Sequence, residues 1–303
     1  MNLSSPLFTV IITTYNRRDL VPRAIQSVLH QTYGDFELLL IDNGSTDDTR
    51  TIVQSIQDPR IKYILNPNPS HSCDAPRNLG IHLAQGTFIS FLDDDDIWYP
   101  KKLEKVKEAF DHYPDVDAVC HDENKRTNGH SDGILRYGPW IDSFYEKLLY
   151  EGNCLSPSAM TLKTNLLRSL NGFRIKEEYF RAADYDFWLR MAKKGVKIYF
   201  LEEILGEFSI TGINLSLLDS TFHLKVAHIV QDHLLSYEGK SLLNLSRRGL
   251  WRIVHLYMLA LRAFLNKGEI KNVFKYSLHV GLMFFIRPLL ILNLCSRLLK
   301  VQS

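Results

Sequence analysis

A short apolar run that ends in four consecutive aspartates constrains this chain more than any other stretch. Residues 87–92 are mostly apolar, β-branched or aromatic, as in a buried strand, and Asp93 to Asp96 follow at once. Two carboxylates about 5 Å apart repel by roughly 3 kcal/mol at an effective dielectric near 20. The run therefore predicts either a site for Mg²⁺ or Mn²⁺, ions that also hold substrate phosphates, or a solvated acidic turn that caps the next helix.

Strand-like and helix-like segments alternate through the first third of the chain, which predicts a doubly wound, mostly parallel sheet. Ser45 or Thr46 is expected to cap the second helix. The expected strands are residues 8–14, 36–41, 61–65 and 87–92, and the expected helices are residues 19–30, 46–57, 74–85 and 100–112.

Polar clusters follow three of these strands, at residues 13–16, 42–45 and 93–96. In parallel sheets, ligands bind beyond the carboxyl ends of the strands. The three clusters are therefore expected to converge on one rim of the sheet and to form a single site there.

The middle of the chain is less regular. A loop is expected over residues 121–139, and residues 121–153 are expected to influence the choice of acceptor. A helix over residues 182–194 carries Asp184 and Asp186 near its beginning. The remaining expected elements are strands at residues 116–120, 158–162 and 196–200 and a helix at residues 165–169.

The chain after residue 221 contains only helix-like segments, so we expect a first domain over residues 1–220 and a helical extension over residues 221–303. Two helices are expected at residues 250–265 and 270–285. The most apolar window, residues 276–295, contains Arg287, and an Arg near the centre of a spanning helix costs roughly 2.5–3.5 kcal/mol. We expect this tail either to lie on an anionic membrane surface or to pack on the first domain or on a second copy of the chain.

Charge and cysteine usage narrow the class of protein. The net charge is only +2, which argues against a general nucleic-acid binder. The four cysteines have no CxxC spacing, as is typical of a reducing compartment, and no basic segment precedes the first apolar run. These features predict a cytoplasmic protein, with the tail as a candidate for contact with the inner face of the membrane.

Five stretches, taken in order, resemble the family 2 glycosyltransferases of the inverting type, and this resemblance covers about residues 7–216. It implies a Rossmann-like GT-A fold of the α/β class and transfer of a sugar from a nucleoside diphosphate. The stretches are VIITTYNR at 10–17, QTYGDFELLLIDNGSTDDT at 31–49, APRNLGIHLAQGTFISFLDDDDIWYP at 75–100, GF at 172–173 and ADYDFWLR at 183–190.

The resemblance assigns the nucleotide-sugar site to the strand ends. Thr13 and Tyr15 are expected to meet the nucleoside, although the Tyr15 ring has the alternative role of a lid over the core. Asp42 and Asn43 are expected to hydrogen-bond the base and the ribose, and Arg77 is expected to reach the nucleotide. A UDP-sugar is the first expectation for the donor.

The family's DxD element falls on Asp93 and Asp95 by this resemblance, with Asp94 between them as a further nucleotide-sugar contact. Asp95 is the first choice for a direct ligand of Mn²⁺ or Mg²⁺. Asp93 would face the ribose or a metal-bound water and is the second metal candidate. For Asp96 a helix cap is the alternative role.

Asp184 is similar in position to the family's catalytic base, which accepts the proton of the attacking hydroxyl group. Asp186 is the competing candidate, although it points to a different helix face. The alternative for Asp184 is a helix-terminal acid that interacts favourably with the helix dipole. Trp188 is expected in the core, not in a sugar platform.

The chain departs from the family pattern in one place. Relatives often carry a His after the last strand, but residues 207–216 contain none, and Thr211, Asn214 or Ser216 are candidates to replace it. A non-catalytic nucleotide-sugar or glycan-binding protein is therefore a second hypothesis. A nucleotidyltransferase would need a glycine-rich phosphate loop after the first strand, and TTYNRRDL has no glycine.

Together, these features predict a metal-dependent inverting glycosyltransferase that acts on a glycan or lipid-linked acceptor in the synthesis of surface polysaccharide or glycoconjugates. The expected partners include no nucleic acid. A homo-oligomer and a peripheral membrane contact are further expectations.

Overall fold

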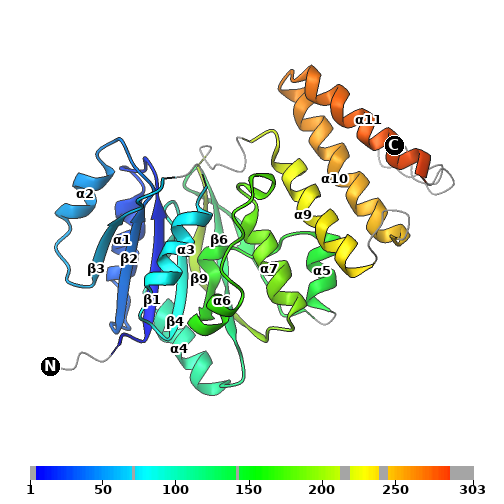
Figure 1. The fold of residues 1–303 in the computed structure, drawn as a ribbon. Coiled ribbons are helices and arrows are strands. Elements are labelled where there is room, and N and C mark those ends of the chain that lie inside the picture. Colours follow the sequence, from blue (N-terminus) through cyan, green and yellow to red (C-terminus); the bar gives the residue numbers. More distant parts are fainter. Residues whose placement is uncertain (1–4, 70–71, 141–142, 212–218, 239–244, 287–303) are drawn as a thin grey trace.

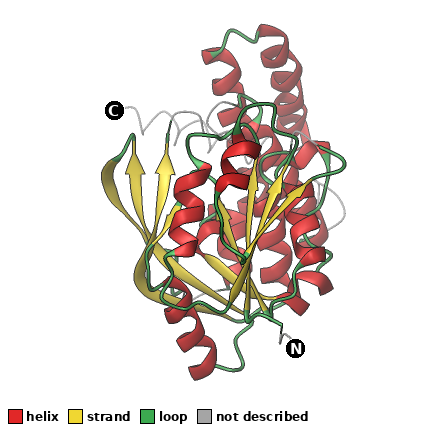
Figure 2. Cartoon of the chain, turned by 90° about the vertical axis from the view of Figure 1, so that its left-hand side faces the viewer, coloured by secondary structure: helices red, strands yellow, loops and turns green. Residues whose placement is uncertain are grey.

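The computed structural model describes residues 5–69, 72–140, 143–211, 219–238 and 245–286. A twisted sheet of nine strands occupies the middle of the molecule, and the last helices extend from one side of it (Figures 1 and 2). The strands are β1 (Phe8–Thr14), β2 (Phe36–Asp42), β3 (Ile61–Leu65), β4 (Phe88–Asp93), β5 (Ile97–Trp98), β6 (Ala118–Thr127), β7 (His130–Leu135), β8 (Met160–Lys163) and β9 (Ile198–Ile210).

Helices connect the strands and continue the chain after β9. They are α1 (Val21–Leu29), α2 (Thr49–Ser55), α3 (Asp74–Leu83), α4 (Lys102–His112), α5 (Phe144–Glu151), α6 (Thr164–Ser169), α7 (Ala183–Lys193), α9 (Phe222–Tyr237), α10 (Arg247–Asn266) and α11 (Ile270–Ile286), with short 3-10 turns η1 (Pro157–Ala159) and η2 (Glu177–Tyr179). Helix α5 was not among the expected elements.

The parallel half of the sheet has the order β3-β2-β1-β4. Every side chain of β1 and β2 is buried, because these β-branched and apolar runs are covered on both faces. The register places Thr14 opposite Asp42 and Thr13 opposite Asp93. The expected α/β class with a Rossmann-like GT-A sheet is confirmed, and the strand ends do meet at one rim.

The second half of the sheet differs from the sequence expectation. Residues 121–139 are not a loop, because β6 continues to Thr127 and forms a hairpin with β7. The last strand does not end near residue 200, because β9 pairs in parallel with β6 as far as Ile210. These segments, which are polar or of mixed composition, form strands because pairing with a distant segment satisfies their backbone hydrogen bonds, and local propensity does not reveal that pairing.

The expected cap of the second helix and the alternative role of Asp96 as a cap are both wrong. Helix α2 begins at Thr49 with Asp48 at its N-cap, and the Ser45 hydroxyl instead accepts a hydrogen bond from the Asn16 N–H at 2.9 Å. Helix α4 begins at Lys102 with Lys101 at its N-cap and no side-chain cap, so Asp96 does not cap it.

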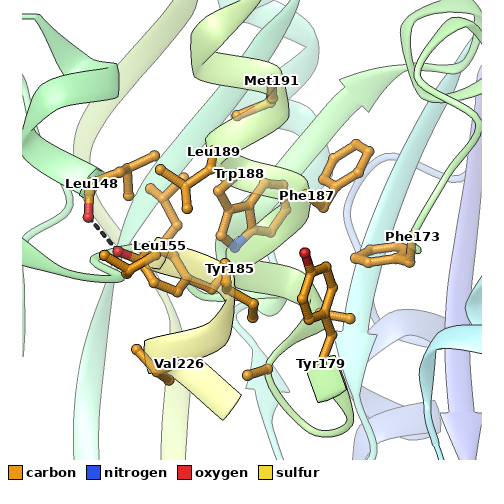
Figure 3. Close-up of a cluster of buried hydrophobic side chains, with 14 of the residues drawn as sticks. Leu148, Leu155, Phe173, Tyr179, Tyr185, Phe187, Trp188, Leu189, Met191 and Val226 are labelled. Carbon is orange, nitrogen blue, oxygen red and sulfur yellow. Dashed lines mark hydrogen bonds between the residues drawn. The ribbon is translucent and has the colours of Figure 1, made fainter. Parts of the chain in front are cut away.

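The cores on the two faces of the sheet are unequal. The smaller core packs α1 and α4 against the sheet, whereas the larger one continues through α7 and α9 to α10. Trp188 lies in this larger core and is fully buried, as expected (Figure 3). The hydroxyl of Tyr185 donates to the Leu148 carbonyl at 2.5 Å and ties α7 to α5.

Beyond β9, the regular elements that the structure describes are all helices, as the sequence predicted. Helix α9 packs on α7 and η2, α10 on α9, and α11 along α10 (Figure 1). Within the described ranges, no helix is both long enough and apolar enough to cross a membrane. The expected final segment, with Arg287, Arg297 and Lys300, lies outside the described residues.

Candidate active site

The loops after β1 and β2 form one wall of the rim. Asn16 adopts a left-handed backbone conformation (φ 52°), and its side-chain oxygen accepts a hydrogen bond from the Thr46 N–H at 2.7 Å. Thr13 is buried at the end of β1, whereas the side chain of Tyr15 is 49% exposed. The Tyr15 ring therefore lies at the surface of the rim and is not a lid over the core.

Asp42 and Asn43, expected to contact base and ribose, are buried and held from several sides. Asp42 accepts hydrogen bonds from the Ser45 N–H at 2.8 Å and from the Tyr63 hydroxyl at 2.6 Å. The Asn43 side chain donates to the Ser72 carbonyl at 3.2 Å and accepts from Asn66 at 2.9 Å. Both side chains are thus fixed in orientation before any ligand binds.

The first three carboxylates of the acidic run reach the rim, and each is only partly exposed. Asp93 pairs with Arg77 at 2.5 Å, and Asp94 lies 3.8 Å from the Nε of Arg17. Two cations therefore border three acids, which leaves an excess of negative charge at the rim.

The fourth aspartate has a structural position. Asp96 is buried and accepts hydrogen bonds from the Ser158 hydroxyl at 2.6 Å and from the Ser209 N–H at 2.8 Å. The same Ser158 oxygen accepts from the Asp93 N–H at 3.1 Å. Asp96 thereby ties the acidic run to η1 and β9 and fixes the turn that presents the other three carboxylates.

The acidic run binds protons more tightly than free carboxylates do. Burial, followed by repulsion from Asp95, raises the pKa of Asp94 to about 7. Burial, followed by repulsion from Asp93, raises the pKa of Asp95 to about 6, although Arg17 and Arg77 oppose the rise. A nearby divalent cation would favour the ionised forms.

The residues present fit such a cation. Within the described part of the chain, no three His, Cys, Asp or Glu side chains are grouped so that they could hold a metal by themselves. Mg²⁺ is commonly bound by one or two carboxylates together with substrate phosphates. Asp95 and Asp93 supply hard oxygen donors of this kind beside the expected nucleotide position.

Arg77 is buried in α3 and belongs to a locked group of side chains. Its guanidinium lies 5.5 Å from the centre of the Phe173 ring, and the neighbouring Asn78 exchanges two hydrogen bonds of 2.8 Å with the Phe173 backbone. Gly172 has φ 59°, and a Cβ there would collide with Asn78 Oδ1. The PRN stretch (residues 76–78) and the GF stretch (residues 172–173) therefore act together to orient Arg77.

Asp184 lies in the first turn of α7 and is partly exposed. Burial raises its pKa to about 6, the charge of Arg77 opposes this rise, and Asp74 and Asp93 add to it. The Asn153 amide donates to Asp184 Oδ2 at 3.3 Å. Arg77 pairs with Asp93, and its charge lowers the pKa of both Asp95 and Asp184, so the acidic run and Asp184 lie within electrostatic reach of the same guanidinium.

Asp186, the competing candidate, is fully buried. It accepts from Arg190 at 2.8 Å, from Arg174 at 3.2 Å and, across to α9, from His233 at 3.1 Å. This carboxylate has no exposed surface for an acceptor, and its partners assign it to the packing of α7.

The sequence predicted no contact of Arg17 or Asn153 with the acids of the site. In the structure, Arg17 lies near Asp94 and Asn153 donates to Asp184. Arg17 could have been found as the last residue of the VIITTYNR stretch, whereas nothing local marks Asn153. Of the three candidates to replace the missing His, Thr211 directly follows β9, and Asn214 and Ser216 lie outside the described residues.

Comparisons with known proteins identify the family of the chain. The family model described as "Glycosyl transferase family 2" matches residues 9–162. A relative from Escherichia coli strain K12, provisionally named as the colanic acid biosynthesis glycosyl transferase WcaA, is 32% identical over 225 residues, which are 69% of this chain and 76% of the relative. Another from Escherichia coli, the UDP-Glc:alpha-D-GlcNAc-diphosphoundecaprenol beta-1,3-glucosyltransferase WfaP, is 30% identical over 63% of this chain and 72% of its own.

Two solved structures share the fold. TarS of S. aureus (residues 1–349, with UDP-GlcNAc) superposes with a TM-score of 0.63 at 17% identity, over 88% of this chain and 89% of its own. The mannosyltransferase PcManGT of Pyrobaculum calidifontis, with GDP-Man and Mn²⁺, gives a TM-score of 0.54 at 16% identity, over 93% and 85%. The family match, the relatives and the fold agree: this chain belongs to glycosyl transferase family 2 and is a glycosyltransferase.

Proposed function

We propose that the chain transfers a sugar, with inversion and with the help of a divalent cation, from a nucleoside diphosphate to a hydroxyl of a glycan or lipid-linked acceptor. The observation that carries this proposal is the position of Arg77, which pairs with Asp93 at 2.5 Å and whose charge lowers the pKa of both Asp95 and Asp184. A guanidinium whose charge reaches both groups of acids suits the diphosphate of a donor whose anomeric carbon faces Asp184.

The donor is proposed to lie along the rim, with its nucleoside against Thr13, Tyr15, Asp42 and Asn43 and with Arg77, Asp93 and Asp94 nearer the diphosphate and ribose. The fixed orientation of Asp42 and Asn43 supports this assignment, because preorganised groups bind without an ordering cost. A UDP-sugar is the preferred donor. Because the similar structures hold UDP-GlcNAc and GDP-Man, both uridine and guanosine donors are tested.

Asp95, with Asp93 as the second ligand, is proposed to hold Mn²⁺ or Mg²⁺. When bound, such a cation supplies positive charge to the departing diphosphate. The raised pKa of Asp95 and the bound Mn²⁺ in a structure of the same fold support this proposal.

Asp184 is proposed as the general base. Its carboxylate accepts the proton of the acceptor hydroxyl while that oxygen forms a bond to the anomeric carbon. The bond from this carbon to the phosphate oxygen breaks on the opposite side, and the nucleoside diphosphate leaves with the electron pair. Asn153, which donates to Asp184 Oδ2, helps to hold the carboxylate in place.

The acceptor is proposed to be a lipid-linked diphosphate sugar of polysaccharide or glycoconjugate synthesis. The names of two relatives support this class, since one refers to diphosphoundecaprenol and one to colanic acid biosynthesis. Residues 121–153, which contain the β6–β7 hairpin and α5, are proposed to select it.

Turnover of UDP- and GDP-sugars with Mn²⁺ or Mg²⁺ and lipid-linked acceptors tests the proposal, with the product's anomeric configuration read by NMR. Inversion is expected, and Asp184→Asn should lower kcat by about 10²–10⁴-fold. Asp111→Asn, at an exposed carboxylate of α4, is the matched control and should keep full turnover. Retention of configuration, or unchanged turnover of Asp184→Asn, would refute the mechanism, and nucleotide binding without turnover of any donor would favour a non-catalytic protein.

A further inference from the structure

The two C-terminal helices carry an apolar surface that the rest of the described chain leaves uncovered. On its inner side, α11 packs against α10, where the Tyr276 and Phe264 rings stack at 5.7 Å. On its outer side, Ile270, Phe274 and Leu278 form a stripe, with exposed fractions of 54%, 75% and 69%. Phe274 and Leu278 are the two most exposed large apolar side chains among the described residues.

Charge is concentrated on the same two helices. We call residues 247–286, which comprise α10, α11 and their connection, the amphipathic hairpin. It carries a net charge of +6 in a chain whose net charge is +2, which leaves −4 for the other residues. Its cations are Arg247, Arg248, Arg252, Arg262, Lys267, Lys271 and Lys275, and its one acid is Glu269.

The one acid of the amphipathic hairpin is engaged within the protein. Glu269 accepts hydrogen bonds from the Ser220 hydroxyl at 2.6 Å and from the Asn272 amide at 2.7 Å. The charge that the amphipathic hairpin can present to a partner therefore comes mainly from its cations.

The cations lie where they can accompany the apolar stripe. Lys271 and Lys275 each follow a stripe residue by one position, which places them about 100° around α11, beside the stripe. Both are exposed. On α10, Trp251 and Met258 are also more than 40% exposed, with the exposed Arg262 one turn beyond Met258. An apolar stripe bordered by lysines is the pattern of a helix that lies in a membrane interface.

We infer that the amphipathic hairpin docks on the surface of an anionic phospholipid bilayer, with Ile270, Phe274 and Leu278 at the acyl boundary and Lys271 and Lys275 among the headgroups. Charge favours anionic lipid over a second copy of the chain as the partner of this surface. A second copy of the chain would bring two hairpins together, each with a formal net charge of +6, whereas anionic lipid has the opposite charge. The amphipathic hairpin lies on the opposite side of the molecule from α2 and β3 (Figure 1).

This inference goes beyond the proposed chemistry. Docking would bring the enzyme to a lipid-linked acceptor, but vesicle binding requires neither donor nor turnover. A failure to bind vesicles would therefore leave the proposed reaction untouched, and a failure of turnover would leave the docking surface untouched.

Flotation of the full chain with vesicles tests the inference. We expect binding to vesicles that contain about one third phosphatidylglycerol, little binding to pure phosphatidylcholine, and weaker binding as salt is raised. The pairs Phe274→Ser/Leu278→Ser and Lys271→Glu/Lys275→Glu should each lower the partition coefficient at least about tenfold. Matched control pairs are Ile134→Ser/Ile175→Ser and Arg23→Glu/Lys197→Glu, which change exposed residues that precede residue 221.

Four results would overturn the inference. The first two are absence of flotation with anionic vesicles and an equal loss of binding in the control pairs. A loss in the lysine pair but not in the Phe274–Leu278 pair would show adhesion by charge alone, without insertion of the stripe. A dimer that dissociates in Phe274→Ser/Leu278→Ser, without vesicle binding, would assign this face to a second copy. Because all substituted side chains are exposed, an unchanged Tm confirms that each variant is folded.

Discussion

Asp184 combines burial with a nearby Arg, and this combination sets a pH dependence. Its pKa of about 6 lies above that of an ordinary aspartate because burial outweighs the charge of Arg77. A general base works only when it is deprotonated, so kcat should be constant above about pH 7 and fall about tenfold per pH unit below pH 6. The measurement is kcat against pH at saturating donor and Mn²⁺.

A control separates Asp184 from the other acids of the site. In Asp184→Asn the residual kcat should no longer fall below pH 6, because the titrating base is gone. If the residual activity of this variant keeps the wild-type pH profile, another group is the base.

Asp96 is expected to contribute mainly to the stability of the fold and not directly to catalysis. Asp96→Ala removes the acceptor of the Ser209 N–H and of the Ser158 hydroxyl, and an unsatisfied buried donor costs about 1–3 kcal/mol. Thermal unfolding should show a lower Tm for Asp96→Ala than for Asp95→Ala, whose side chain reaches the rim. The reverse order of the two Tm values would mean that Asp96 does not anchor the acidic run.

Among the elements, α7 links the site to the helical tail through one buried carboxylate. Asp186 on α7 binds Arg190, Arg174 and, across to α9, His233. Removing one partner of a buried charged group leaves the others uncompensated, so Asp186→Ala should lower the free energy of unfolding by about 3 kcal/mol. Urea titration measures this loss, and Arg174→Ala, at a half-exposed partner, should cost less.

The same carboxylate predicts acid sensitivity. Although burial raises the pKa of Asp186, hydrogen bonds from His233 and Arg190 lower it below the usual aspartate value. Its ionised form therefore stabilises the fold above the unfolded pKa of 3.8, and this contribution is lost as pH falls through the lower folded pKa. Unfolding titrations below pH 4 should show a smaller loss of stability in Asp186→Ala than in the unchanged chain, and equal losses would contradict this role.

Elements with a strong local pattern were predictable, and elements that depend on distant pairing were not. The apolar runs of β1, β2 and β4 mark buried strands whatever their neighbours, and the polar clusters after them reach one rim. By contrast, Glu123 to Thr127 are all polar and only half of Glu207 to Ile210 is apolar, and the two segments become strands because each pairs with the other. No local signal records that pairing.

The site, too, has residues that a local sequence pattern predicts and residues whose roles depend on distant partners. The acids of the rim could be named from one stretch each, but the lock between Asn78, Gly172 and Phe173 joins two stretches about 95 residues apart. The resemblance placed both stretches without explaining either. The role of Asp96 also could not be read locally, because its partners, Ser158 and Ser209, come from η1 and β9.

At the scale of the whole molecule, the proposed chemistry requires two sites near Arg77. Asp95 serves nucleotide and cation binding, Asp184 serves as the general base, and each function can be removed without the other. Calorimetric titration of UDP and GDP, with and without Mn²⁺, into the unchanged chain, Asp95→Asn and Asp184→Asn tests this requirement. Asp184→Asn should bind the preferred nucleotide with nearly unchanged Mn²⁺-dependent affinity while transferring no sugar, and Asp95→Asn should lose the Mn²⁺-dependent part of binding. Equal Mn²⁺-dependent affinity in Asp95→Asn and the unchanged chain would contradict a nucleotide and cation site at this rim.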